Sequence, residues 1–179
     1  MTKKVRIFIF FCATFFGLHG MDLDVDGGNA WNALLLPVGT SLKSVKLKNL
    51  EIDCAFWEKW DVFEFNKEEL RSLSIDACAF SETEDFAFLY GFAVSELSIT
   101  NCQITDDKLM SLLGFIHPYT VLKINLSGNN LGRDVQLFEK ALSNIPFIGA
   151  ALDELNLSSN PVDSSITGKN YKSVKKITV

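Results

Sequence analysis

The cysteines are the residues of this chain best suited to chemistry, because a thiol can form a disulfide, bind zinc or act as a nucleophile. Beyond the first twenty residues they are Cys54, Cys78 and Cys102, which are too widely spread for a zinc knuckle. Three is also an odd number, unlike the even framework of a small secreted disulfide scaffold. We therefore interpret them as free thiols in the core, where free cysteine is common. A disulfide between Cys78 and Cys102 stays open as the alternative.

Other catalytic residue patterns are missing from the sequence. His117 is the only histidine after residue 20, and it lies beside Pro118 rather than near a nucleophile and a carboxylate. The sequence has no paired His/Cys metal spacing, glycine-rich phosphate loop or nucleophile elbow. We therefore expect a protein that is not an enzyme and that uses no cofactor or metal.

Cys78 and Cys102 belong to an eleven-residue motif of the form L-x-x-L-x-L-x-x-N/C-x-L, which occurs five times. The copies are residues 42–52, 70–80, 94–104, 121–131 and 152–162. The ninth position carries Cys78, Cys102, Asn129 and Asn160, and Leu50 is the exception. Each copy reads as a strand whose positions 1, 4, 6 and 11 point inward, and the ninth-position amides can bond buried backbone groups. A partial sixth copy begins at Val174.

The connectors between the copies have apolar residues at helical spacing. These are Phe56, Trp60 and Phe63; Phe86, Leu89, Tyr90 and Ala93; Leu109, Leu112, Leu113 and Ile116; and Phe138, Ala141, Leu142 and Ile145. We predict four helices there, with a capping box at residues 81–84 and a cap at Thr105 or Asp106. The last connector, residues 161–173, is short and polar, so a loop or one 3₁₀ turn is expected.

Together these features resemble the leucine-rich repeat superfamily, in its ribonuclease-inhibitor-like and cysteine-containing classes. The resemblance implies an α/β solenoid of about five to six repeats, with a curved parallel sheet on the concave face and helices on the convex face. It also implies a role in binding other proteins. Residues 42–179 form the repeat domain, and residues 21–41 form an N-terminal capping unit with an alternating strand at 21–26.

The N-terminal segment reads as a secretory signal peptide over residues 1–20. A basic start is followed by an apolar run over residues 7–18 and the small residue Gly20. An uncleaved membrane anchor is the alternative. The chain has a net charge of −5 and becomes more acidic when Lys3, Lys4 and Arg6 are removed. This disfavours nucleic acid as a partner, and no stable membrane insertion is expected after cleavage.

The strand positions between the inward residues should face solvent and form the candidate protein-binding surface. They run from basic at the first copy, through small hydroxyls, to acidic at the fifth copy. We expect the binding residues to be Lys43, Lys46, Lys48, Arg71, Ser74, Glu96, Ser98, Lys123, Asn125, Glu154 and Asn156. Two other groups are interpreted structurally: the aromatic group Trp57, Trp60, Phe63 and Phe65 as core, and the basic group Lys172, Lys175 and Lys176 as solvated surface.

Asn125 and Asn156 each begin an Asn-Leu-Ser sequence, which makes them candidate N-glycosylation sites in a eukaryotic secretory pathway. The motif itself generates this tripeptide, and we favour that simpler account.

The leading hypothesis is a secreted leucine-rich repeat protein that binds a protein partner through its concave strand face, with a pathogen effector as one form of this role. The alternatives are an enzyme inhibitor or adaptor of the ribonuclease-inhibitor type, and an extracellular surface structural protein.

Overall fold

The computed structural model describes residues 21–27, 42–52, 70–81, 86, 89, 94–116, 121–143, 152–168 and 174–179. Several predictions from the sequence lie outside these residues. They concern the signal peptide at 1–20, the rest of the capping unit at 28–41, the aromatic group at 57–65, the capping box beyond Ser81, Cys54, His117, Ile145 and Lys172.

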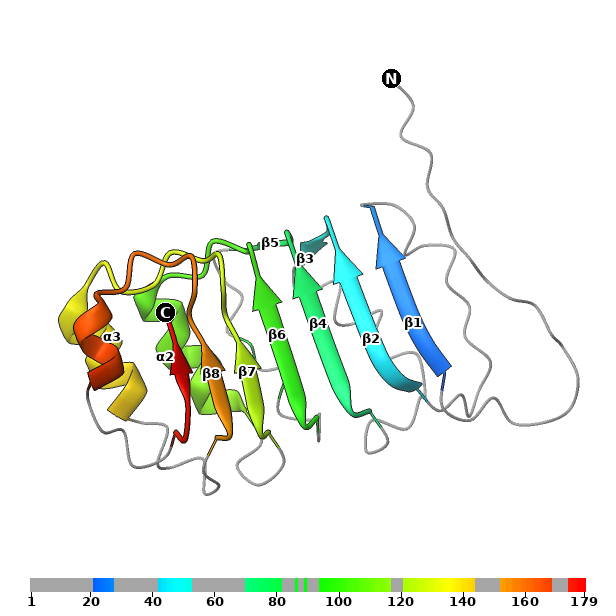
Figure 1. Cartoon of the computed structure of the whole chain (residues 1–179). Coiled ribbons are helices and arrows are strands. Elements are labelled where there is room, and N and C mark those ends of the chain that lie inside the picture. The colour runs from blue at the N-terminus through cyan, green and yellow to red at the C-terminus, as the bar shows by residue number, and fades with distance from the viewer. Residues whose placement is uncertain are drawn as a thin grey trace, which may run out of the picture.

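The described chain is a mixed α/β structure built on a seven-stranded sheet (Figure 1). Its strands, in spatial order, are β1 (Met21–Asp26), β2 (Leu42–Lys48), β4 (Ser72–Asp76), β6 (Glu96–Thr100), β7 (Lys123–Asn125), β8 (Glu154–Asn156) and β9 (Ile177–Thr178). Every neighbouring pair is parallel. The strand predictions are therefore confirmed, including the alternating strand at 21–26 and the partial copy at the C-terminal end.

Successive copies of the motif pair in register, so equivalent positions lie side by side. Leu73 pairs with Leu97, Leu97 with Ile124, and Ile124 with Leu155. A second, two-stranded parallel sheet joins β3 (Glu51–Ile52) to β5 (Ala79–Phe80) just beyond the turns. The same residue spacing thus places the motif residues of one copy against those of the next.

The core lies on one side of the large sheet. Positions 1, 4, 6 and 11 of the motif are buried in all copies except at Phe80 and Val162, which are half-buried. The α-helices described on this side are α2 (Asp106–Phe115) and α3 (Val135–Ser143), which lie toward the C-terminal end of the sheet and belong to the same apolar cluster as the strands (Figure 1). Their buried residues are Leu109, Leu112, Leu113, Phe138, Ala141 and Leu142, as the helical spacing predicts.

The ends of the helices differ in part from the prediction. Thr105 occupies the N-cap position of α2, but its side chain makes no capping hydrogen bond. At the other helix, α3, a side-chain cap is present: the Asp134 Oδ1 accepts the N–H groups of Gln136 and Leu137 at 3.1 Å each. In the second connector Phe86 and Leu89 are buried, and the Leu89 N–H donates to Phe86 C=O at 2.9 Å. Phe86 has a φ of 62°, so a regular right-handed helix cannot include it.

The last connector forms the 3₁₀ helix η5 (Ser164–Gly168), which confirms the expectation of one short turn in that polar segment. A 3₁₀ turn satisfies local backbone groups without the length that an α-helix requires.

Position 8 of every motif copy adopts a left-handed backbone conformation. The residues are Asn49, Ala77, Asn101, Gly128 and Ser159, with φ values of 55°, 52°, 56°, 70° and 61°. This conformation ends each strand and turns the chain toward the core side. The N–H groups of the first four donate to the position-7 carbonyl of the next strand at 2.9–3.2 Å. Asn and Gly are the residues that most easily adopt this conformation, so the sequence held a signal for this turn.

Candidate interaction face

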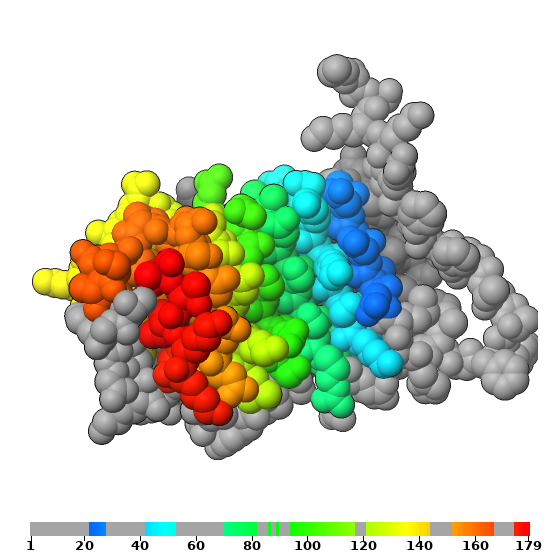
Figure 2. Space-filling view, in the orientation of Figure 1, coloured from blue at the N-terminus to red at the C-terminus, as the bar shows by residue number. Residues whose placement is uncertain are grey.

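The face of the large sheet opposite the core is made by positions 3, 5 and 7 of the strands, and we call it the front face. Because the strands pair in register, each position forms a row across the sheet. The central row, at position 5, contains Asp24, Lys46, Ser74, Ser98, Asn125, Asn156 and Thr178. Figure 2 shows this face in space-filling form, from β1 in blue to β9 in red.

All eleven residues expected to bind a partner lie along this face or at its margin. Exposed residues are Lys43, Lys46, Lys48, Arg71, Glu96 and Lys123, and half-buried ones are Ser74, Ser98, Asn125, Glu154 and Asn156. The structure therefore places them together on one surface, although they come from segments of the sequence that are far apart.

Most charges at the C-terminal end of the front face are paired across neighbouring strands. Lys123 Nζ lies 2.9 Å from Glu96 Oε1, and Lys176 Nζ lies 2.6 Å from Glu154 Oε1. Just beside them, Lys175 Nζ lies 2.6 Å from Asp153 Oδ1. Lys175 and Lys176 are exposed, as the interpretation of a solvated surface expects, and each is also an ion-pair partner of the acidic fifth copy.

The gradient from basic to acidic residues that the five copies predict is offset by opposite charges at the two edges of the sheet. β1 places Asp22, Asp24 and Asp26 beside the lysines of β2, in register with Ser44, Lys46 and Lys48. At the other edge β9 brings lysines to the acidic residues of β8. The gradient was inferred from the five full copies alone, and the edge strands lie outside them.

These exposed ion pairs set local pKa values but add little stability, because solvent screens them. The hydrogen bond to Glu96 and its charge raise the pKa of Lys123. The hydrogen bond from Lys176 and its charge lower the pKa of Glu154. Both shifts favour the charged forms of Lys123 and Glu154.

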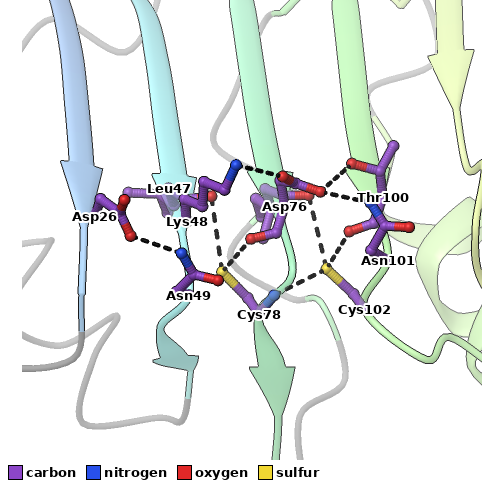
Figure 3. Close-up of polar contacts among 10 residues, drawn as sticks. Asp26, Leu47, Lys48, Asn49, Asp76, Cys78, Thr100, Asn101 and Cys102 are labelled. Carbon is purple, nitrogen blue, oxygen red and sulfur yellow. Dashed lines mark hydrogen bonds and ion pairs between the residues drawn. The ribbon is translucent and has the colours of Figure 1, made fainter.

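The upper edge of the front face carries a hydrogen-bonded network around Asp76 (Figure 3). Asp76 Oδ1 accepts from Asn101 Nδ2 at 2.8 Å and from Thr100 Oγ1 at 2.9 Å, and Lys48 Nζ lies 3.3 Å from its Oδ2. These contacts, led by the one with Asn101, lower the pKa of Asp76. A similar bond joins Asn49 Nδ2 to Asp26 Oδ1 at 2.7 Å. Asn49 and Asn101 were not predicted to act here, although both are Asn at position 8.

Directly inside this network lie the two described cysteines, which are free and buried. The prediction of free core thiols is confirmed for Cys78 and Cys102. The Cys102 sulfur accepts the Cys78 N–H at 3.4 Å and donates to Thr100 C=O at 3.0 Å, while the Cys78 sulfur donates to Asp76 C=O at 3.4 Å (Figure 3). Burial raises the pKa of both thiols, that of Cys102 to about 12. Both are therefore poor nucleophiles.

The next two copies have asparagine at the same position, and their amides are satisfied as predicted. Asn129 Oδ1 accepts the N–H groups of Cys102 at 3.0 Å and Ile104 at 3.1 Å, and its Nδ2 donates to Ile99 C=O at 2.7 Å. Asn160 repeats the arrangement one copy later, with its Oδ1 accepting Leu131 N–H at 3.1 Å. The hydrogen bonds of these position-9 amides therefore join each of the two copies to the copy before it.

The candidate glycosylation residues lie in the central row. Asn125 and Asn156 are register partners on β7 and β8. Their side-chain oxygens accept the N–H groups of Ser127 and Ser158 at 3.1 and 3.0 Å, so each amide is held against its own strand.

Comparison with known proteins gave no match. No family model, no curated protein and no solved structure resembles this chain closely enough to be reported. The site must therefore be judged on its own geometry. Among the described residues, no three His, Cys, Asp or Glu side chains are grouped so as to hold a metal ion. In the same part of the chain, no helix has both the length and the apolar character needed to cross a membrane.

Proposed function

We propose that this chain is a leucine-rich repeat solenoid that binds a protein partner through the front face of its sheet. The observation that supports this is the face itself, a surface of seven parallel strands whose opposite side packs against the apolar core. The five motif copies support the repeat assignment, because their inward positions and their ninth-position column recur in register.

The chemistry of the front face suits a protein surface. From β4 to β8 its central row is made of the small polar residues Ser74, Ser98, Asn125 and Asn156. Ion pairs lie on either side of this row, Lys123–Glu96 at position 3 and Lys48–Asp76 at position 7. Because these side chains are small, a partner can approach the central row closely. The charged residues on either side of the row can fix the orientation of the partner. We also propose that the chain is secreted, because residues 1–20 have the pattern of a signal peptide. N-terminal sequencing of exported protein tests whether this segment is removed.

Blocking the middle of the face tests the binding proposal. Ser98 lies on the central strand β6, between Ser74 and Asn125. In Ser98→Arg a long side chain projects from the central row, so we expect any stoichiometric partner captured by the full wild-type chain to be lost. Gln136→Arg introduces the same residue at an exposed position on α3 and should leave capture unchanged. Equal capture by wild-type protein and Ser98→Arg, with both folded by circular dichroism, would contradict the proposal.

A further inference from the structure

Among the described residues, most charged side chains of the front face are paired with an opposite charge on a neighbouring strand, but those at its lower margin are not. Four ion pairs join neighbouring strands or the residues just before them: Lys48–Asp76, Lys123–Glu96, Lys175–Asp153 and Lys176–Glu154. Lys43 and Arg71, in contrast, are neighbours of like charge. The Arg71 N–H donates to Lys43 C=O at 2.8 Å, one residue before the register pair Ser44 and Ser72.

Placing two cations on adjacent strands is unfavourable, because strands lie about 4.8 Å apart and like charges at that spacing repel. Both side chains are exposed, and within the described residues neither forms an ion pair. Lys46 lies three residues after Lys43 on β2, and it too is exposed and makes no ion pair in this part of the structure. These three residues form what we call the cation cluster.

Acidic residues of the described chain lie on both sides of the cation cluster. On the β1 side, Asp24 is the register partner of Lys46, and the Asp22 carboxylate accepts a hydrogen bond from the Ser44 hydroxyl at 2.5 Å. On the β6 side, the Glu96 N–H donates to Arg71 C=O at 3.1 Å, but the Glu96 carboxylate is paired with Lys123. Lys46 and Arg71 also face the hydroxyl residues Ser74 and Ser95. Among the described residues, therefore, no carboxylate forms an ion pair with Arg71.

We infer that the cation cluster receives a carboxylate of an acidic protein segment. The Arg71 guanidinium can bind a carboxylate through two parallel N–H groups, and Lys43 can add a third donor. An acidic peptide fits better than a nucleic acid. Three cations make a small footprint, and the net charge of −5 repels a long polyanion. This inference rests on the proposed function, since it states the chemistry of the partner on the same face.

A labelled hexaglutamate peptide tests the inference directly. Its binding to the full chain is followed by fluorescence anisotropy at low salt, with hexalysine as the opposite-charge peptide. Arg71→Glu and Lys43→Glu should each weaken hexaglutamate binding about fivefold or more, since a favourable pair becomes a repulsive one. Lys140→Glu makes the same charge change at an exposed position on α3 and should leave the affinity unchanged. No binding by wild type, or equal weakening by Lys140→Glu, would overturn the inference.

Partner capture separates this inference from the broader proposal. Loss of a captured protein in both Ser98→Arg and Arg71→Glu supports both. Loss in Ser98→Arg with full retention in Arg71→Glu and Lys43→Glu overturns the acidic-segment inference alone. Retention in Ser98→Arg overturns the proposed use of the face.

Discussion

The side-chain oxygen of Asn129 accepts the backbone N–H of Cys102 at 3.0 Å, across 27 residues of sequence. A side chain from one motif copy thereby satisfies a buried backbone group of the copy before it. The same position holds a thiol in two copies and an amide in two others, so the strength of this link varies along the sheet.

Asn129→Ala should destabilise the protein by about 3 kcal/mol, because several buried backbone groups lose their partners at once. Asn129 is only 7% exposed, and its amide bonds with Cys102, Ile104 and Ile99. The shift in the urea unfolding midpoint measures the effect. Asn130→Ala, at the neighbouring half-buried asparagine, serves as the control and should cost well under 1 kcal/mol, as is usual away from such networks. Similar losses in both variants would contradict this account.

Ala77→Gly should stabilise the protein by about 1 kcal/mol. Ala77 has a φ of 52°, where a Cβ is sterically strained and glycine is not. Ala79→Gly in β5 has no such strain to relieve and should lose stability. Thermal unfolding of the two variants distinguishes them, and a loss of stability in Ala77→Gly would show that the left-handed turn is not strained.

Gly128→Ala should lose about 2 kcal/mol, because its φ is 70° and an added Cβ would lie 2.1 Å from the Asn101 Oδ1. Gly114→Ala provides the matched comparison. Gly114 lies in α2, where an added Cβ meets nothing within 4 Å, and alanine should stabilise the helix by about 0.5–1 kcal/mol. We expect the urea unfolding midpoint to fall in Gly128→Ala and to rise in Gly114→Ala. Shifts of the same sign in both variants would refute this prediction.

Asp106→Ala should cost about 3 kcal/mol, because the Asp106 carboxylate is only 5% exposed and holds the loop before α3. Its two oxygens accept the N–H groups of Gly132 at 2.6 Å and Asp134 at 2.7 Å. Asp107→Ala, at the exposed residue next to it, should change stability far less. Hydrogen exchange at the Gly132 and Asp134 amides should accelerate only in Asp106→Ala, and unchanged protection there would count against this role.

Raising the pH above 9 should destabilise the wild-type protein through Cys102. Burial raises the pKa of the folded thiol from 9.0 to about 12, so between these values the unfolded thiol ionises while the folded one stays protonated. Stability is therefore fully present below pH 9 and is lost progressively as the pH approaches 12. Urea midpoints at pH about 8 and about 10.5 should fall more for wild type than for Cys102→Ala. An identical fall in both proteins would show that other groups cause it.

The sequence by itself determined the strands, their order and their inward residues. Positions 1, 4 and 6 of each copy are apolar, and no single copy can bury them, so stacking in register is the simple physical solution. The same periodicity placed the candidate binding residues on one exposed face and the cysteines in the interior. Helices α2 and α3 followed from apolar residues at spacings of three and four.

Only the tertiary structure decided which polar and charged groups meet. Lys176 reaches Glu154, Asn101 reaches Asp76, and Asp106 bonds Gly132, each across 22 to 26 residues. Backbone periodicity fixes which face a side chain occupies, but its partner depends on the register of the neighbouring strand and on the reach of both side chains. For that reason the edge strands β1 and β9 changed the charge pattern that the five copies predict, and left Lys43 and Arg71 as neighbours of like charge.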